Sequence, residues 1–253
     1  MTSSWDLLFV GLAALVAGAV NAIAGGGTLI TFPMLSAVGL PPVAATVTNA
    51  VALCPGYLGG VLAQARELRG QTRLLGLLLP AALLGGIAGG ALLLSTEEKL
   101  FRSIVPFLIL GASLLTAVQE PLRRWLARRG GSAKPVLLSI AGVVLVVLAA
   151  VYGGYFSAGL SVIVLGVLGL MFEGTFTRLN AIKGAISFVT NFSATMFFMT
   201  SSHVVWLAAL VMALAALVGG TVGGRFASRV RPATLRWCVV AVGTAVGIGY
   251  LIH

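Results

Sequence analysis

The stretch that decides the fold reads Asn21-Ala22-Ile23-Ala24-Gly25-Gly26-Gly27-Thr28, three consecutive glycines between two apolar runs. In hydrocarbon, each unpaired N–H or C=O group of an irregular backbone is unfavourable by on the order of a few kcal/mol, so such a break is tolerated only inside the protein or beside a wet cavity. It predicts a broken or re-entrant helix whose free amides and positive dipole end face an anion. Close helix packing, or a simple turn at the membrane surface, is the structural alternative.

The rest of the chain belongs in a bilayer. Of 253 residues, 59% are hydrophobic and 9% are charged, whereas an ordinary soluble domain has about 25% charged residues. Apolar runs close to the roughly 20 residues of a membrane span recur from end to end. They cover approximately residues 5–24, 27–40, 42–63, 73–94, 100–119, 136–154, 156–172, 179–200, 203–224 and 233–252. We expect an all-α polytopic membrane protein, one membrane domain over residues 1–253, with a retained first helix.

The formal net charge of +10 reports topology and gives no reason to expect a nucleic-acid partner. The basic residues gather in three connections: Arg66, Arg69 and Arg73; Arg123, Arg124, Arg128, Arg129 and Lys134; and Arg225, Arg229 and Arg231. Loops rich in Lys and Arg lie on the cytoplasmic side. Counting outward from these loops predicts that both termini lie outside, in a multi-pass protein of the cell (inner) membrane.

An internal repeat divides the chain. Residues 84–90 align with residues 218–224 at a spacing of 134, which also places Arg102 on Arg236, and residues 46–49 align with residues 177–180 at a spacing of 131. The halves are residues 1–120 and 135–253, joined by a cytoplasmic linker at 121–134. The first half begins outside and the second inside, so we expect two inverted repeats of about five helical segments each, with the broken helices at their pseudo-twofold interface. Arg102 and Arg236 are interpreted as anchors at the membrane surface.

The repeated Gly-Gly-x-x-Gly-Gly stretches carry Gly85, Gly89, Gly219 and Gly223 at small-xxx-small spacing, which favours close helix packing. Such faces serve packing within a chain and between chains, so a homo-oligomer remains open.

The counterpart of the first break is Tyr152-Gly153-Gly154-Tyr155-Phe156-Ser157-Ala158-Gly159, which is not a phosphate loop because no Gly-Lys-Ser/Thr follows. Two breaks in corresponding positions predict a binding site at the midplane between the halves. The candidate binding residues are Asn21, Gly25, Gly26, Gly27, Thr28, Thr48, Asn49, Tyr152, Tyr155, Ser157, Gly159, Asn180 and Lys183.

Three of these residues have alternative roles. Asn49 and Asn180 either bind substrate or hold the broken helices in place, because an amide in hydrocarbon needs a partner. Lys183 lies inside an apolar run, where a charge indicates function unless it reaches the cytoplasmic surface. The acidic residues fall at segment ends or in loops, so no proton relay is expected. Neither Cys54 nor Cys238 belongs to a metal motif, and no cofactor or metal is expected.

The alternative functions are an intramembrane enzyme and a scaffold without a substrate. An intramembrane enzyme would have only Lys183 and Ser187 as base and nucleophile, and the chain has neither HExxH nor GxSxG. A scaffold without a substrate would have dry glycine breaks packed against side chains.

The residues as a set resemble the TauE/SafE sulfite exporter family: Asn21 to Gly27 with Pro33, Gly39 with Thr48-Asn49, then residues 152–155 with Asn180 and Lys183. The resemblance covers essentially the full length. It implies a secondary transporter, an exporter, of sulfite or a related organosulfur anion, which works by alternating access and is not an enzyme. Where this chain has Ser157 the family commonly has glycine, which bears on the substrate. Other small organic anions, and export against import, remain open.

Overall fold

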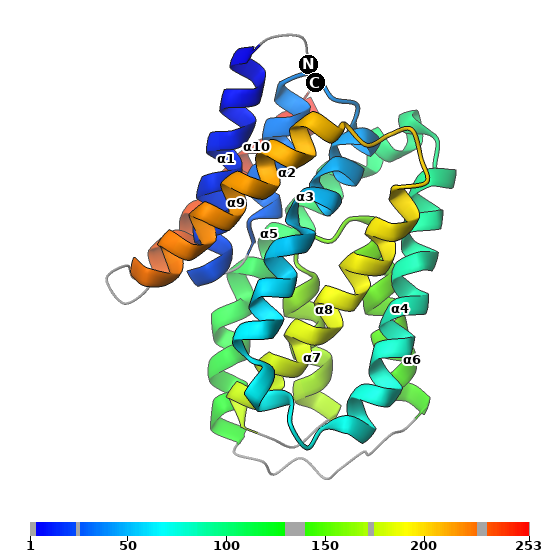
Figure 1. The fold of residues 1–253 in the computed structure, drawn as a ribbon, viewed down its shortest axis with the longest axis vertical. Helices are drawn as coiled ribbons and strands as arrows, with labels where there is room; N and C mark the ends of the chain where they lie inside the picture. The colour runs from blue at the N-terminus through cyan, green and yellow to red at the C-terminus, as the bar shows by residue number, and fades with distance from the viewer. Residues whose placement is uncertain (1–3, 24–25, 130–139, 172–174, 227–231, 253) are drawn as a thin grey trace.

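The computed structural model describes residues 4–23, 26–129, 140–171, 175–226 and 232–252, and every regular element among them is helical. The helices are α1 (Ser4–Ile23), α2 (Thr28–Ala37), α3 (Pro42–Ala63), α4 (Thr72–Ser95), α5 (Glu98–Arg129), α6 (Ile140–Tyr155), α7 (Leu160–Met171), α8 (Phe176–Phe198), α9 (Trp206–Phe226) and α10 (Pro232–Ile252), with a 3-10 helix, η1 (Ala65–Leu68), after α3 (Figure 1). The predicted all-α class is confirmed.

The helices have the lengths and composition of a multi-pass membrane protein. Within the described residues, α1, α3, α4, α5 and α10 are long and apolar enough to cross a bilayer, and α2, α6, α7 and α9 contain shorter apolar stretches. Large apolar side chains stand on the outer surface, among them Leu12 on α1 and Leu207, Leu210 and Leu214 on α9. Water would not solvate such a surface favourably, and a bilayer covers it.

Helix α5 is longer than predicted. It continues beyond the apolar segment 100–119 to Arg129, so residues 121–129 of the predicted linker are helical. Its last turns are amphipathic: Arg124 is exposed, whereas Leu126 is buried against α7, where a Cβ at Gly169 would overlap the Leu126 side chain. A prediction from hydropathy alone ends this helix too early, because the arginines on its exposed face lower the mean hydropathy of the last turns.

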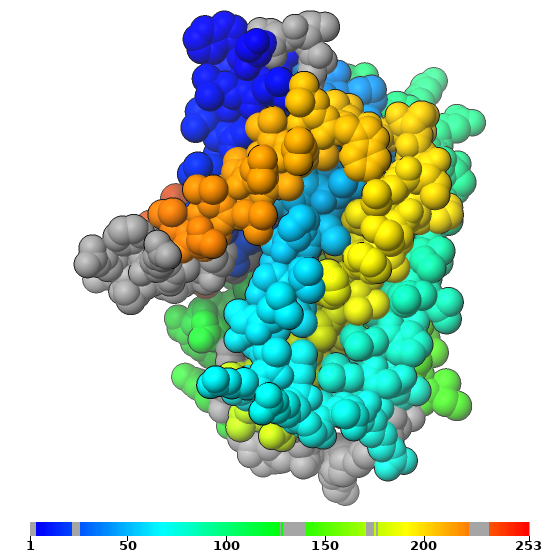
Figure 2. All heavy atoms as spheres, in the orientation of Figure 1, coloured from blue at the N-terminus to red at the C-terminus, as the bar shows by residue number. Residues whose placement is uncertain are grey.

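The packing repeats with a period of five helices. α1 packs against α9 as α6 packs against α4, and α3 packs against α9 as α8 packs against α4. α3 also packs against α8, and α5 against α10. In Figure 1, α1 begins at the top, where both termini lie, whereas α6 begins at the bottom. The space-filling view shows α9 lying across α1 and α3 (Figure 2). Helices from the two halves of the chain therefore interlock.

Glycines make the closest of these crossings. A Cβ built at Gly85 on α4 would lie 2.8 Å from the carbonyl oxygen of Val147 on α6. A Cβ built at Gly219 on α9 would overlap the carbonyl oxygen of Leu15 on α1. In each of these two pairs, α4 with α6 and α9 with α1, the helix backbones approach closely, as the small-xxx-small spacing predicts.

Two hydrophobic clusters flank the centre of the molecule. One joins α1, α2, α3 and α9 with the first half of α5, and it includes Ala194 and Phe198 near the end of α8. The other joins α4, α6 and α7 with the first half of α8, where it includes Ile182 and Ile186. The middle of α8 lies between them.

Candidate functional site

The first helix break lies between α1 and α2. Gly25 lies outside the described residues, and Gly26 has a φ of +92°, a left-handed conformation that glycine adopts without strain. The side-chain oxygen of Asn21 accepts a hydrogen bond of 2.7 Å from the N–H of Gly27. The Asn21 side chain, near the end of α1, therefore ties that helix to the residue before α2, and the Gly27 N–H already has a hydrogen-bond partner.

A second contact ties this break to α3. The Thr31 hydroxyl oxygen lies 2.5 Å from the Asn49 side-chain oxygen and 3.2 Å from the Gly27 carbonyl oxygen, and its single proton serves one of them at a time. Thr28, Thr31 and Asn49 are all buried. In this conformation Asn49 therefore holds the broken helix in place, one of its two predicted roles. Sequence reasoning missed Thr31, whose only signal was its position one helical turn after Gly27.

Thr48 is not part of this cluster. Its hydroxyl oxygen accepts a hydrogen bond of 3.1 Å from the N–H of Val205, just before α9. In this contact Thr48 supports the connection between α8 and α9.

The second break, between α6 and α7, closes in a different way. The Tyr152 hydroxyl donates a hydrogen bond of 2.7 Å to the carbonyl oxygen of Ala158, across the break. Ser157 has a φ of +62° and Gly159 a φ of +78°. Ser157 is therefore held in a backbone conformation that non-glycine residues seldom adopt. The Tyr155 hydroxyl lies 3.5 Å from the hydroxyl oxygen of Thr96, at the end of α4.

The two breaks meet through aromatic rings. Phe32 on α2 and Phe156 in the second break have ring centroids 5.4 Å apart, edge to face. Phe101 on α5 adds contacts of 6.5 Å to Phe156 and 5.5 Å to Tyr155. Phe32, Phe101 and Phe156 are at most 1% exposed. Sequence reasoning placed the breaks together but did not identify the rings between them.

Asn180 and Lys183 belong to a separate polar cluster. The Asn180 amide donates a hydrogen bond of 2.7 Å to the side-chain oxygen of Gln64, directly after α3, and the Lys183 ammonium donates one of 2.8 Å to the Asn180 side-chain oxygen. Gln64 lies 15 residues beyond Asn49, about 22 Å along an α-helix. One small anion therefore cannot contact Asn49 and Asn180 together in this conformation.

The Lys183 contact also bears on the enzyme alternative. The ammonium is bonded to Asn180, and the Ser187 hydroxyl has no hydrogen-bond partner in the described part of the chain. The base and nucleophile pair is therefore not formed.

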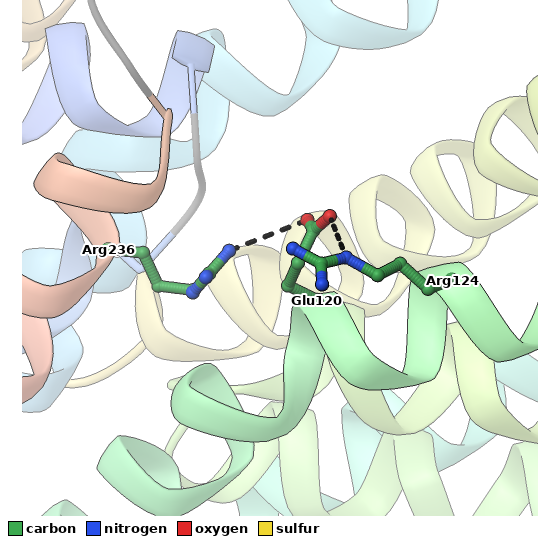
Figure 3. A network of polar contacts seen from close by, with 3 residues as sticks. All are labelled: Glu120, Arg124 and Arg236. Atoms are coloured by element: carbon green, nitrogen blue, oxygen red, sulfur yellow. Dashed lines mark hydrogen bonds and ion pairs between the residues drawn. The ribbon is translucent and has the colours of Figure 1, made fainter.

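Glu120 links the last helix of each half. Its carboxylate lies 3.5 Å from the Arg236 guanidinium on α10 and 3.1 Å from that of Arg124, one turn along α5 (Figure 3). Arg236 is 8% exposed, so its interpretation as an anchor at the membrane surface is wrong, whereas Arg102 is exposed. The sequence shows Arg236 only as the fourth residue of the apolar run 233–252 and does not show that it is buried next to a carboxylate of another helix.

Comparisons with known proteins show the family of the chain. The family described as "Sulfite exporter TauE/SafE" matches residues 10–250. A Sinorhizobium protein named "Probable membrane transporter protein ORF9" is 28% identical over 97% of this chain and 92% of its own length. The "Probable membrane transporter protein" of Haemophilus influenzae is 26% identical over 83% of this chain and 80% of its own length. "Probable membrane transporter protein YfcA" of Escherichia coli K12 is 24% identical, covering 85% and 77%. No solved structure matches the chain.

Proposed function

Because the chain belongs to the TauE/SafE sulfite exporter family and is a membrane transporter, not an enzyme, we propose that it carries a small anion as a secondary transporter. Sulfite or a related organosulfur anion is the first candidate, and other small organic anions are the alternative. The residues 1–253 act as one transport domain of two inverted repeats, which rock against each other to expose the site to either side alternately.

The observation that carries this proposal is the meeting of the two broken helices. Their breaks are joined by the Phe32–Phe156 contact, and the groups described around them are amides and hydroxyls: Asn21, Thr31, Asn49 and Tyr152. Neutral hydrogen-bond donors and the positive end of a helix suit an anion. The opposite starting ends of α1 and α6 in Figure 1 support the inversion.

The predicted binding residues divide into two groups in this proposal. The central group is Asn21, Gly25, Gly26, Gly27, Thr28, Asn49, Tyr152, Tyr155, Ser157 and Gly159, and Thr48 adjoins it next to Asn49 on α3. Asn180 and Lys183 form the other group, at the cytoplasmic entrance, because Lys183 donates to Asn180 and Asn180 donates to Gln64, next to the basic connection of Arg66 and Arg69. There Lys183 attracts the anion before it reaches the breaks.

Export is the favourable direction for an anion. A potential that is negative inside the cell releases about 2.3 kcal/mol per 100 mV for each negative charge moved outward. The proposal places both termini outside the inner membrane. Single cysteines at the exposed positions His203 and Arg69, with Cys54 and Cys238 replaced by serine, test this orientation. An impermeant maleimide added to whole cells should label position 203 and leave position 69 unlabelled; the reverse pattern contradicts the orientation.

Flux through the purified protein in liposomes tests the function. We expect a membrane potential to drive sulfite or methanesulfonate flux, with sulfate and lactate as comparison anions. Asn49→Ala and Lys183→Ala should each lower the flux at least tenfold, whereas Lys99→Ala, which changes an exposed lysine at the start of α5, should not. No flux of any anion by the wild-type protein would overturn the function. Unchanged flux in both variants would overturn the site assignment alone.

A further inference from the structure

Three polar side chains in the middle of α8 are buried without a hydrogen-bond partner. The side-chain oxygens of Ser187, Thr190 and Asn191 bond to nothing in the described part of the chain. These residues are 2%, 0% and 2% exposed. An unpaired buried polar group is unfavourable and rare in native proteins, so each calls for a partner such as a ligand or an ordered water.

Several buried hydroxyls elsewhere in the protein follow the usual rule for helices. Thr46 donates to the carbonyl oxygen of Pro42 at 2.9 Å, and Ser113 donates to that of Ile109 at 2.8 Å. A hydroxyl inside an apolar helix meets its need for a hydrogen bond by donating to the backbone carbonyl oxygen one turn earlier. Ser187 and Thr190 make no such bond, so these hydroxyls remain available to a partner outside the helix.

The three side chains lie on one face and continue a polar row. Positions 187, 190 and 191 are three and four residues apart, which places them side by side on a helix. Lys183 lies one turn before Ser187, and its ammonium bonds Asn180 a further turn away. The row therefore runs from the cytoplasmic entrance to the level between the two hydrophobic clusters.

Part of the α8 surface next to this row is open at Gly184. Two contacts bridge α3 and α8: the Thr195 hydroxyl with the Ala50 carbonyl oxygen at 3.3 Å, and Asn180 with Gln64. Between these bridges, a Cβ built at Gly184 on α8 would meet nothing within 4 Å.

The chemistry of the row suits an oxyanion. The Ser187 and Thr190 hydroxyls can donate, and the Asn191 carboxamide donates through its NH2 group when the amide is turned over. The row itself contains no carboxylate, and Lys183 supplies a positive charge. We propose that Ser187, Thr190 and Asn191 bind the oxygens of a small anion on its way between α3 and α8, after Lys183 has drawn it in from the cytoplasmic side. This site rests on the proposed transport function and extends it to a helix position that neither glycine break contains.

Paired variants separate binding from folding. Thr190→Val and Ser187→Ala remove an unpaired hydroxyl at little change in shape, and Asn191→Leu removes the amide. Thr46→Val and Ser113→Ala are the matched controls, since both remove a buried hydroxyl that has a helix partner. The measurements are the thermal unfolding midpoint in detergent without anion, and the sulfite concentration that gives half-maximal flux in liposomes.

We expect Thr190→Val and Ser187→Ala to unfold at or above the wild-type midpoint while raising the half-saturating sulfite concentration about tenfold, and Asn191→Leu to raise it as well. The controls should show the opposite: a lower midpoint and unchanged half-saturation. Wild-type half-saturation in both hydroxyl variants would overturn the site and leave water as the partner of these atoms. A wild-type protein that moves no anion would instead overturn the transport function.

Discussion

Replacing Gly85 with alanine tests how the two halves of the chain are joined. Gly85 lies on α4 where that helix crosses α6. A Cβ there would lie 2.8 Å from the Val147 carbonyl oxygen and 2.6 Å from the Ala150 Cβ. Ordinary contact begins at 3.4 Å, so the two backbones must separate by about 0.6 Å to accommodate the oxygen alone. Close packing of this kind leaves little room for relaxation.

The magnitude follows from two opposing effects. Overpacking a tight contact costs about 1–3 kcal/mol, whereas replacing glycine with alanine inside a helix stabilises it by about 0.5–1 kcal/mol. Gly76 is the matched control because it lies on the same helix and its Cβ would meet nothing within 4 Å. Gly76→Ala should therefore stabilise the protein, and the two variants should differ by about 1–3 kcal/mol in the free energy of unfolding.

Unfolding by increasing fractions of SDS in mixed micelles, followed by the fluorescence of the four tryptophans, measures this difference. The expected order of stability is Gly76→Ala, wild type, then Gly85→Ala. Equal stability of the two variants, or a more stable Gly85→Ala, would refute the backbone contact between α4 and α6.

Three further changes probe the polar contacts. Glu120→Gln removes the carboxylate beside the buried Arg236 and should lower the free energy of unfolding by about 1–3 kcal/mol, since a buried charge loses its partner; an unchanged denaturation midpoint would contradict this. Tyr152→Phe loses the hydrogen bond to Ala158 and should cost about 1 kcal/mol in the same denaturation and slow anion flux, whereas wild-type values would show that the second break does not need it. Ser157→Gly relieves the positive φ and should stabilise the protein by about 0.5–1 kcal/mol, and a lower thermal midpoint would exclude strain at this residue.

The helices and breaks were predictable because their causes are local. The apolar run predicted over 42–63 is helix α3, Pro42–Ala63, and the first glycine-rich stretch separates α1 from α2. In the second stretch, Gly153 and Gly154 are still part of α6, and the break that separates α6 from α7 begins after Tyr155. Hydrophobicity along the chain and the helix-weakening effect of glycine act within a few residues. The same local signals predicted too early an end for α5, because its last turns are stabilised by packing of Leu126 against α7.

The roles of polar residues were not predictable in this way. Asn21 was expected to bind an anion, and Asn49 either to bind substrate or to hold the broken helices in place; in the structure Asn21 bonds Gly27 and Asn49 bonds Thr31. Arg236 was expected at the surface and is buried beside Glu120. Whether a polar group is satisfied depends on atoms that other helices bring within about 3 Å, and neither residue spacing nor hydropathy contains those distances.

By itself, the sequence therefore determined the bilayer as the solvent, the positions of the helices, the two breaks and the family. Only the tertiary structure decided that Asn21 bonds the amide of Gly27 at the first break, that Phe32 and Phe156 join the two breaks, and that three unpaired polar side chains lie together on α8. The physical reason is that the two kinds of interaction act over different distances along the chain. Hydrophobic and helical preferences add up along a segment, whereas a hydrogen bond or a ring contact exists only after packing has set the separation of two helices.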